Sequence, residues 1–366
     1  MSKMMPEKAC SPSVCVIVVH YKGLEMLEKC LESLFNTDYG NFEVILVDNG
    51  SDDDLHELIA KAHGHRLEVI RSNVNLGVVS GRNLALRQVR TDYAVLLDDD
   101  AVVESDWLIE LIHEAEKDTK IGACQPKLMS LMNPKFFEYN GACGGMLDVY
   151  GVPLTRGRIF DLAEEDSGQY NKPVEIFWAS GAALFLRTSV VRTVGLQDET
   201  FWAQMEEIDL CWRIRLGGYK VMSVPSSIVY HLGAGAMLPD KFYLKNRNNL
   251  IMIIKNYSGR NLVRFLPLRM IQDSFSFIYY LIKKERARSM PIIRAYAWLL
   301  KNFHLALSRR HDSQRTRRIG DKKIIDAMVR KSVAIQHYIL GRKYFSQLNG
   351  LPLEMENYTN RDCKRN

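Results

Sequence analysis

The sequence lacks the features of a disulfide framework and of a membrane span. Its seven cysteines, at positions 10, 15, 30, 124, 143, 211 and 363, are odd in number and form no C-x-x-C pair. The N-terminus shows no basic head followed by an apolar core, and no apolar run of about 20 residues is free of charged residues. These absences predict a reducing, cytoplasmic location with buried or idle thiols.

Two phosphate-binding loops are also missing. A dinucleotide-binding fold places G-x-G-x-x-G after its first strand. Here the residues after the first predicted strand are H-Y-K-G-L-E (20–25), and no Walker phosphate loop is present. Binding of NAD or FAD is therefore disfavoured.

Charge is divided unevenly along the chain. The 366 residues, 47% of them apolar, suit one large globular domain plus an appendage. Residues 1–240 carry 22 Lys and Arg against 35 Asp and Glu, a balance of −13, whereas residues 241–366 carry 27 against 8, a balance of +19. The two parts are expected to meet different partners. A basic segment attracts nucleic acid or an anionic membrane, or forms only a solvated surface.

Short apolar runs alternate with segments of helical period in the N-terminal third. The runs lie at 14–19, 44–47, 67–70 and 93–97. Between them, apolar residues repeat at intervals of three and four within 24–34, 55–59 and 84–89. This alternation predicts a parallel sheet covered by helices on both faces.

Polar residues follow the predicted strands, and in such sheets the strand ends meet at one cleft. His20 and Tyr21 follow the first strand, Asp48 the second, and the run D-D-D (98–100) the fourth. Three adjacent carboxylates repel one another, and clustered oxygen ligands suit Mn²⁺ or Mg²⁺ bridging to a substrate phosphate. We therefore predict a metal site here, with acids that cap the following helix as the alternative.

The stretch N-V-N-L-G-V-V-S-G-R-N (73–83) predicts a helix start suited to an anionic group. It places Gly77 and Gly81 at the opening of a helix, with Arg82 on the first turn, and helix N-termini beside an arginine bind anions. Asp48 lies in V-D-N-G-S, where its carboxylate is placed to accept hydrogen bonds from a nucleobase or ribose. The same Asn-Gly pair is also common in turns without function.

Three acids gather at the head of a predicted amphipathic helix in A-Q-M-E-E-I-D-L-C-W-R-I-R (203–215). Glu206 and Asp209 share one helix face, and Arg213 lies four residues beyond Asp209 and is expected to pair with it. This pairing leaves a neighbouring glutamate available as a general base toward an acceptor hydroxyl. The helix dipole alone also favours acids here.

His231 and Trp178 each allow two interpretations. His231 ends another β-like run in V-Y-H-L-G-A-G, so it is either an added metal ligand or a structural histidine. Trp178 lies with Ser180 and Gly181 in F-W-A-S-G-A-A-L-F. Its ring is either exposed for stacking on a sugar or base, or part of the core.

In this order the segments resemble the family 2 glycosyltransferases of GT-A fold, particularly the rhamnosyltransferase-like branch. The resemblance covers about residues 13–249 and rests on V-I-V-V-H-Y, V-D-N-G-S, N-x-N-L-G-x-x-x-G-R-N, L-L-D-D-D, W-A-S-G-A, E-E-I-D-L-C-W-R-I-R-L-G-G-Y-K-V and P-S-S-I-V-Y-H. It implies an α/β fold with a Rossmann-like, mixed but mostly parallel sheet. The expected parts are an N-terminal extension (1–12), a catalytic domain (13–249) with nucleotide-binding (13–105) and acceptor (106–249) halves, and a basic, largely helical C-terminal region (250–366).

The resemblance implies a nucleotide-diphosphate sugar as donor, linked to dTDP, UDP or GDP, with Mn²⁺ or Mg²⁺ between its phosphates and the D-x-D acids. Asp48 resembles the nucleobase acid, Asp98 the ribose or metal-shell acid, and Asp100 the direct metal ligand, with His231 as an added ligand. The other residues expected to bind the donor are His20, Tyr21, Asn75, Gly77, Arg82, Asp99, Trp178, Ser180 and Arg213.

The base of the resembled family is the second acid of an E-D-x-D segment, and Glu207 holds that position here. Glutamate lengthens the arm by one methylene relative to aspartate, so either Glu207 reaches from a retracted helix or Glu206 takes the role. The implied reaction is an inverting transfer to a glycan or lipid-linked saccharide. The alternatives are a nucleotidyltransferase acting on a sugar phosphate and an inactive sugar-nucleotide-binding homologue.

Residues 261–282 are apolar enough to suggest a membrane helix, but three charged residues interrupt the run and Pro267 is expected to bend it. The basic residues that follow at 283–288 predict a helix lying on the inner face of the cell membrane. A buried helical appendage or a homodimer surface is the alternative. No nucleic-acid partner is expected, because no RNA-binding signature accompanies the arginine pairs.

Overall fold

The computed structural model describes residues 11–62, 66–139, 141–233 and 240–355. The predicted extension 1–12 lies mostly outside this range, as do Cys10 and Cys363. The five described cysteines are buried and form no disulfide, as predicted. Burial raises the pKa of the Cys15 and Cys211 thiols to about 12, so these thiols are chemically inert at neutral pH.

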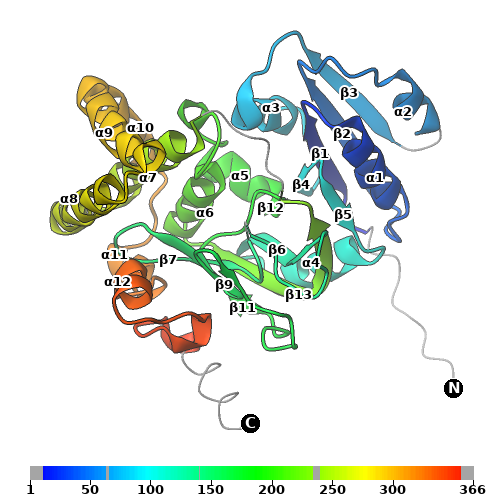
Figure 1. Cartoon of the computed structure of the whole chain (residues 1–366). Helices are drawn as coiled ribbons and strands as arrows, with labels where there is room; N and C mark the ends of the chain where they lie inside the picture. The colour runs from blue at the N-terminus through cyan, green and yellow to red at the C-terminus, as the bar shows by residue number, and fades with distance from the viewer. Residues whose placement is uncertain (1–10, 63–65, 140, 234–239, 356–366) are drawn as a thin grey trace, which may run out of the picture.

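A nine-stranded mixed sheet forms the centre of the described molecule (Figure 1). Its strands, in chain order, are β1 (Val14–His20), β2 (Phe42–Asn49), β3 (Leu67–Ser72), β4 (Tyr93–Asp98), β5 (Ala101–Val103), β6 (Ile121–Ser130), β11 (Val174–Glu175), β12 (Ala183–Arg187) and β13 (Lys220–His231). Their order in space is β11-β13-β6-β12-β4-β1-β2-β3, with β5 paired to β13. The four strands from β4 to β3 are mutually parallel, and β12 runs antiparallel to both of its neighbours. The expected mixed, mostly parallel sheet is confirmed.

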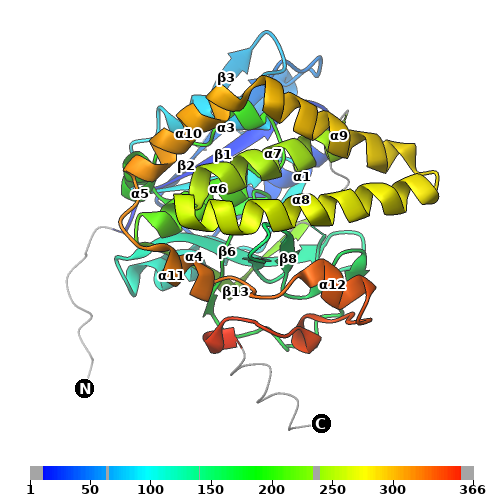
Figure 2. The same ribbon diagram turned by 90° about the vertical axis from the view of Figure 1, so that its left-hand side faces the viewer.

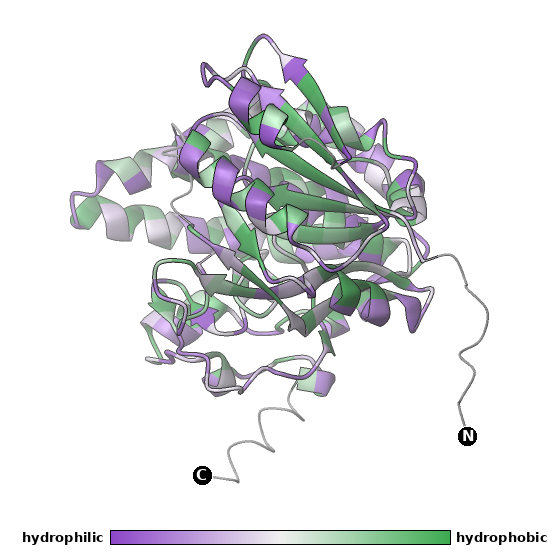
Figure 3. Ribbon diagram, turned by 90° about the vertical axis from the view of Figure 1, so that its right-hand side faces the viewer, coloured by the Kyte–Doolittle hydropathy of each residue, from purple (hydrophilic) through white to green (hydrophobic). Residues whose placement is uncertain are grey.

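Helices cover both faces of this sheet. The helices that flank the sheet are α1 (Leu24–Phe35), α2 (His56–Lys61), α3 (Gly77–Leu86), α4 (Trp107–Glu116), α5 (Thr188–Val194) and α6 (Glu206–Leu216). Side chains alternate along each strand, so Val14, Val16 and Val18 enter one apolar cluster while Cys15 and Ile17 enter the other. The middle strands are accordingly apolar on both faces, and Figure 3 shows them in green between helices that are purple on their outer sides.

A smaller four-stranded antiparallel sheet packs beside the central one. Its strands are β7 (Gly145–Leu147), β8 (Pro153–Thr155), β9 (Arg158–Ile159) and β10 (Leu162–Ala163). Met146, Leu147 and Leu154 from this sheet belong to the main apolar cluster. A short 3-10 turn, η1 (Glu199–Phe201), leads toward α6.

The basic C-terminal region is helical, as expected. It contains α7 (Lys241–Asn256), α8 (Gly259–Ile282), α9 (Arg286–Lys301), α10 (Phe303–Arg315), α11 (Asp321–Asp326), α12 (Val333–Tyr338) and the 3-10 turn η2 (Phe345–Gln347). Helix α7 runs across the predicted boundary between residues 249 and 250. Ile324, Val329 and Phe345 are buried in the main core, so the last part of this region packs on the catalytic domain.

Helix α8 continues through Pro267 as one helix of 24 residues. Figure 2 shows α8 lying along one side of the molecule, with α9 beside it and α12 below. Within the described residues, no helix has both the length and the apolar character required to span a membrane.

Candidate active site

The strand register brings the predicted site residues to one edge of the sheet. His20 is the partner of Asp48 across β1 and β2, and Val19 is the partner of Asp98 across β1 and β4. The chain then turns into β5, whose first residue pairs with His231 at the end of β13. The ends of four strands therefore surround the D-D-D run, although one of them, β13, comes from much later in the chain.

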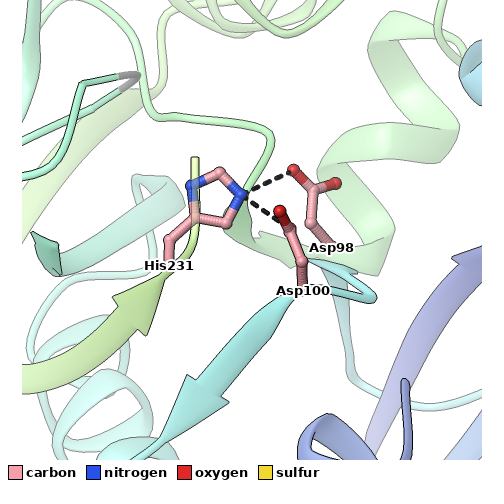
Figure 4. A group of neighbouring side chains, drawn as sticks. All are labelled: Asp98, Asp100 and His231. Atoms are coloured by element: carbon pink, nitrogen blue, oxygen red, sulfur yellow. Dashed lines mark ion pairs between the residues drawn. The ribbon is translucent and has the colours of Figure 1, made fainter. Parts of the chain in front are cut away.

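Asp98, Asp100 and His231 form a compact cluster at this edge (Figure 4). Nε2 of His231 lies 2.8 Å from Oδ1 of Asp100 and 3.5 Å from Oδ2 of Asp98. One ligand atom from each residue lies within 4.8 Å of the other two. Two carboxylates and an imidazole form a donor set that Mn²⁺ accepts, and carboxylates suit Mg²⁺. The cluster therefore fits the divalent cation that the sequence predicted.

Acids flank both ring nitrogens of His231. On the side away from the cluster, Nδ1 lies 3.1 Å from Oε1 of the buried Glu138. Burial alone would lower the pKa of His231, but Asp100, Asp98 and Glu138 outweigh it and raise that pKa well above its usual value. A carboxylate behind an imidazole fixes the ring orientation, as is common for metal-binding histidines.

His20 joins two acidic segments beneath the cleft. Its Nδ1 lies 2.7 Å from Oδ2 of Asp99, and its Nε2 lies 2.9 Å from Oδ2 of Asp53. Burial alone would lower the pKa of His20, but Asp99 and Asp53 raise it above its usual value. The middle acid of the run thus bonds to His20, while the two outer acids lie at the cluster. His20 ties the loop after β2 to the acidic run.

Arg82 holds two acids of the site together. Its Nη2 donates to Oδ1 of Asp98 at 2.6 Å and to the carbonyl of Gly181 at 2.7 Å, and its Nη1 lies 3.3 Å from Oε1 of Glu206. A side chain at Gly181 would place its Cβ 2.8 Å from Nη1, so this approach requires glycine. The predicted place on the first helical turn is wrong, because α3 begins at Gly77 and Arg82 is its sixth residue. The guanidinium is 3% exposed and positions acids, rather than facing solvent as a phosphate ligand.

Replacing Arg82 with glutamine is expected to destabilise the protein by about 3–5 kcal/mol, because the buried Glu206 and the partly buried Asp98 would lose their shared cation. Urea unfolding measures this loss. The matched control is Arg87→Gln on the same helix end, where the ion pair with Glu199 joins side chains that are 52% and 44% exposed. That control should cost less than about 1 kcal/mol. Equal losses for the two variants would contradict the role assigned to Arg82.

The two glutamates at the start of α6 differ in their surroundings. Glu206 is 5% exposed and faces Arg82, whereas Glu207 is the one residue of α6 that is not buried. The helix is therefore enclosed on nearly every side, and the prediction that it is amphipathic is wrong. Oε2 of each glutamate is buried and has no hydrogen-bond partner among the described residues, while Oε1 of Glu206 faces Arg82. Burial, with the neighbouring Glu206, raises the pKa of Glu207 to about 8.

The segment before α6 is strained. Trp202, Gln204 and Met205 have φ angles of 63°, 72° and 73°, a left-handed region that such side chains rarely adopt. The side-chain amide of buried Asn248 in α7 donates to three carbonyls within residues 201–204. Helix α7 therefore fixes the backbone that sets the direction of α6 and its glutamates.

The loops on the nucleotide side are tied together by amide side chains. Asn49 donates to Oδ1 of Asn75 at 3.2 Å, and the same Asn75 oxygen accepts from the backbone of Gly77 at 2.8 Å. Gly77 has a φ of 80°, and a Cβ there would lie 2.6 Å from the indole of Trp202. Asn75 and Gly77 therefore shape the start of α3 and its contact with the strained segment.

Asp48 and Tyr21 lie at the predicted edge of the cleft. Asp48 is 8% exposed, and its Oδ1 accepts hydrogen bonds from the backbone and the hydroxyl of Ser51 at 3.0 and 2.8 Å. Tyr21 is 37% exposed, with the Lys22 ammonium 5.2 Å from its ring centroid. Tyr21 is therefore exposed at the strand end, whereas Asp48 is buried.

Trp178 and Ser180 are corrected from donor-binding residues to core residues. Trp178 is 4% exposed, packs against Gly145 and donates from Nε1 to the carbonyl of Met146 at 2.7 Å. Ser180 is 1% exposed, and its hydroxyl accepts from the backbone of Ala182 at 3.2 Å. These two residues build the loop that carries Gly181 to Arg82.

Arg213 is likewise structural. Its Nε donates to Oδ2 of Asp209 at 2.9 Å, which confirms the expected pair. Its other nitrogens donate to the carbonyls of residues 194–196 beyond the end of α5. Asp209 is fully buried and also pairs with Lys255 of α7 at 3.0 Å. Arg213 therefore ties α6 to the end of α5, and Asp209 continues this contact to α7.

Three residues of the site were missed by sequence reasoning. Asp53 lies in the S-D-D-D run after β2, and this second acidic run was the available signal. Glu138 and Asn248 lie in ordinary local sequence, so only their contacts with His231 and with residues 201–204 reveal them.

Comparison with known proteins finds sequences and structures similar to this chain. The model of the glycosyl transferase family 2 matches residues 15–182. A poly-beta-1,6-N-acetyl-D-glucosamine synthase of Staphylococcus epidermidis is 21% identical over 220 residues, 60% of this chain and 50% of that protein. The uncharacterized protein y4gI of Sinorhizobium fredii is 27% identical over 231 residues, 60% of this chain and 24% of that protein. The matched part of this chain spans half or less of the length of each of these relatives.

Solved structures share the fold. GalNAc-T7, solved with UDP, GalNAc and Mn²⁺, has a TM-score of 0.55 and 16% identity over 70% of this chain and 50% of that one. S. aureus TarS 1-349 has a TM-score of 0.51 and 18% identity over 83% of this chain and 89% of that one. The GT-A-type architecture with a C-terminal helical region is thereby confirmed. Residues 15–182 thus match the glycosyl transferase family 2 model, and the described molecule shares the fold of GalNAc-T7 and TarS.

Proposed function

We propose that this protein transfers a sugar, with inversion, from a nucleotide-diphosphate sugar to a hydroxyl of a glycan or of a lipid-linked saccharide. One observation carries the proposal. Two adjacent carboxylates with raised pKa values and unpaired oxygens, Glu206 and Glu207, are linked through Arg82 to a cluster of metal-binding type at Asp98. This combination supplies a base and an anchor for a diphosphate.

Glu207 is the proposed base. It accepts the proton of the acceptor hydroxyl while that oxygen attacks the anomeric carbon. The bond from this carbon to the diphosphate oxygen breaks on the opposite face, and its electron pair leaves with the diphosphate. One displacement inverts the configuration. Glu206 is the weaker candidate, since Arg82 already occupies one of its oxygens.

Asp98, Asp100 and His231 would hold Mn²⁺ or Mg²⁺, which when bound supplies positive charge to the leaving phosphates. Arg82 keeps Asp98 ionised: burial alone would raise the pKa of Asp98, but Arg82 and His231 hold it below its usual value. His20, through Asp99 and Asp53, keeps the nucleotide-side loop fixed against the acidic run. These residues organise the site before the donor arrives.

A panel of UDP-, dTDP- and GDP-sugars, with and without Mn²⁺, tests the donor. UDP-sugars come first because similar structures were solved with UDP or UDP-GlcNAc, and dTDP-rhamnose is included because of the resemblance to rhamnosyltransferases. The true donor is expected to raise the melting temperature in the presence of Mn²⁺, because it binds the folded state alone.

Turnover decides between the remaining functions. Hydrolysis of the stabilising donor, and an inverted anomer in the NMR spectrum of the product, would support transfer. Consumption of a nucleoside triphosphate with a sugar phosphate would instead indicate a nucleotidyltransferase. Donor binding without any turnover would indicate an inactive homologue.

A further inference from the structure

Helix α8 has polar residues on its buried side and apolar residues on its exposed side. Its buried residues, spaced four apart, are Asn261, Phe265, Arg269 and Asp273. The exposed large apolar residues of the helix are Val263, Leu268, Met270, Ile271, Phe275, Ile278, Tyr279, Leu281 and Ile282. A helix that faces water has the opposite arrangement, so this outer face is suited to a covering partner.

The orientation of α8 is fixed by its buried polar residues. Arg269 pairs with Asp273 at 2.8 Å and also donates to the carbonyl of Tyr150 and to Oδ1 of Asn249. The hydroxyl of Tyr296 donates to Asp273 at 2.8 Å. Rotating the helix to hide its apolar side would break these contacts. The buried polar partners of Arg269 and Asp273 would then be left unpaired in the interior.

Helix α12 extends the same surface. Figure 2 shows α12 below α8, and Tyr338 of α12 interacts electrostatically with Tyr280 and Tyr279 near the end of α8. Four residues at or just after α12 are exposed and apolar: Ile335, Tyr338, Ile339 and Leu340. The exposed apolar residues of α8 and α12 are called the apolar face below.

Basic residues lie at one end of the apolar face. Lys283, Lys284, Arg286 and Arg288 are all exposed at the turn between α8 and α9. The one acid between them, Glu285, pairs with Arg288 at 3.3 Å. An apolar helix face that ends in cations is complementary to an anionic bilayer, where apolar side chains enter the acyl boundary and cations meet lipid phosphates.

A second copy of the chain suits this surface less well. An isologous contact would bring the same patch of each copy together, and the turn offers four cations against one acid. Where the two-fold axis lies near this turn, like charges face like charges. The charge pattern therefore favours lipid over self-association.

We propose that the apolar face seats this protein on an anionic bilayer, with Phe275, Ile278 and Ile282 in the headgroup region and Lys283 and Lys284 at the phosphates. This attachment does not depend on the transfer reaction. It would hold the active site near acceptors that are themselves anchored in lipid.

Vesicle flotation of the full chain tests the proposal. The protein is expected to float with phosphatidylcholine vesicles that contain phosphatidylglycerol, to float much less with phosphatidylcholine alone, and to detach partly in high salt. The double substitution Ile278→Glu with Ile282→Glu should weaken binding by about tenfold or more, and so should Lys283→Glu with Lys284→Glu. All four side chains are exposed, so the fold should be retained.

The control is Met132→Glu, which places an acid at a 77% exposed apolar residue outside the apolar face and should bind as the wild type does. Absence of flotation at low salt, or unchanged binding by both double variants, would overturn the proposal. A dimer in analytical ultracentrifugation that Ile278→Glu with Ile282→Glu dissociates would also overturn it, and would assign the face to a second copy.

Discussion

Replacing Asp100 with alanine is expected to lower sugar transfer by about 100-fold or more and to remove the metal dependence of donor binding. Asp100 supplies one of the two carboxylates of the cluster, and its Oδ1 lies 2.8 Å from His231. Without it, the remaining ligands hold a divalent cation weakly. Calorimetric titration of the donor, with and without Mn²⁺, measures the change directly.

The matched control for Asp100→Ala is Asp99→Asn, one residue earlier in the same acidic run. Asp99 bonds to His20 rather than lying in the cluster, so its amide variant should keep metal-dependent donor binding. An Asp100→Ala protein that binds the donor with an unchanged response to Mn²⁺ would refute the metal site. Loss of binding in Asp99→Asn alone would move the site toward His20.

Replacing Glu207 with glutamine is expected to lower turnover by about 1000-fold while donor binding stays as in the wild type, because general-base catalysis typically contributes about 100- to 10,000-fold. In the wild type, kcat/KM should rise as the pH rises toward about 8, since only the ionised carboxyl accepts the proton. The residual activity of the variant should lack this rise. Retained turnover in Glu207→Gln, with loss in Glu206→Gln, would move the base to Glu206.

The same Glu207→Gln substitution is expected to stabilise the protein at alkaline pH. Because burial raises the pKa of Glu207 in the folded state to about 8 from a usual value of 4.5, the folded state holds this proton more tightly than the unfolded state. Stability is therefore lost as the pH rises from about 4.5 to about 8. Above that range the glutamine variant should be more stable by on the order of 2 kcal/mol. Urea unfolding at acidic and alkaline pH should show the gain only at the alkaline end.

Much of the parallel half of the sheet could be predicted from sequence. Strands such as Val14–His20 are apolar on both faces and end in polar residues. The position of each strand, its end and the edge that the ends share can therefore be read from neighbouring residues in the sequence. The acidic run was found for the same reason, since three carboxylates directly after a buried strand have no local explanation. These features depend on residues that are neighbours in sequence.

The errors fall where partners are distant in sequence. Trp178 and Arg213 have side chains that suit a ligand, but the carbonyl of Met146 and the carbonyls of residues 194–196 occupy them. Arg82 follows a helix start that suits an anion, yet its partner Glu206 lies 124 residues away. Short-range pattern carries no information about which of these polar groups is already paired.

The sequence by itself determined the order of strands and helices in the N-terminal third, the acidic edge of the sheet and the division of charge, because each depends on periodicity and composition. Only the tertiary structure decided which acids face the cluster, which glutamate pairs with Arg82, and that α8 turns its apolar side outward. The physical reason is the same in each case. Whether a buried polar group is satisfied, or an apolar face covered, depends on contacts between residues far apart in the chain.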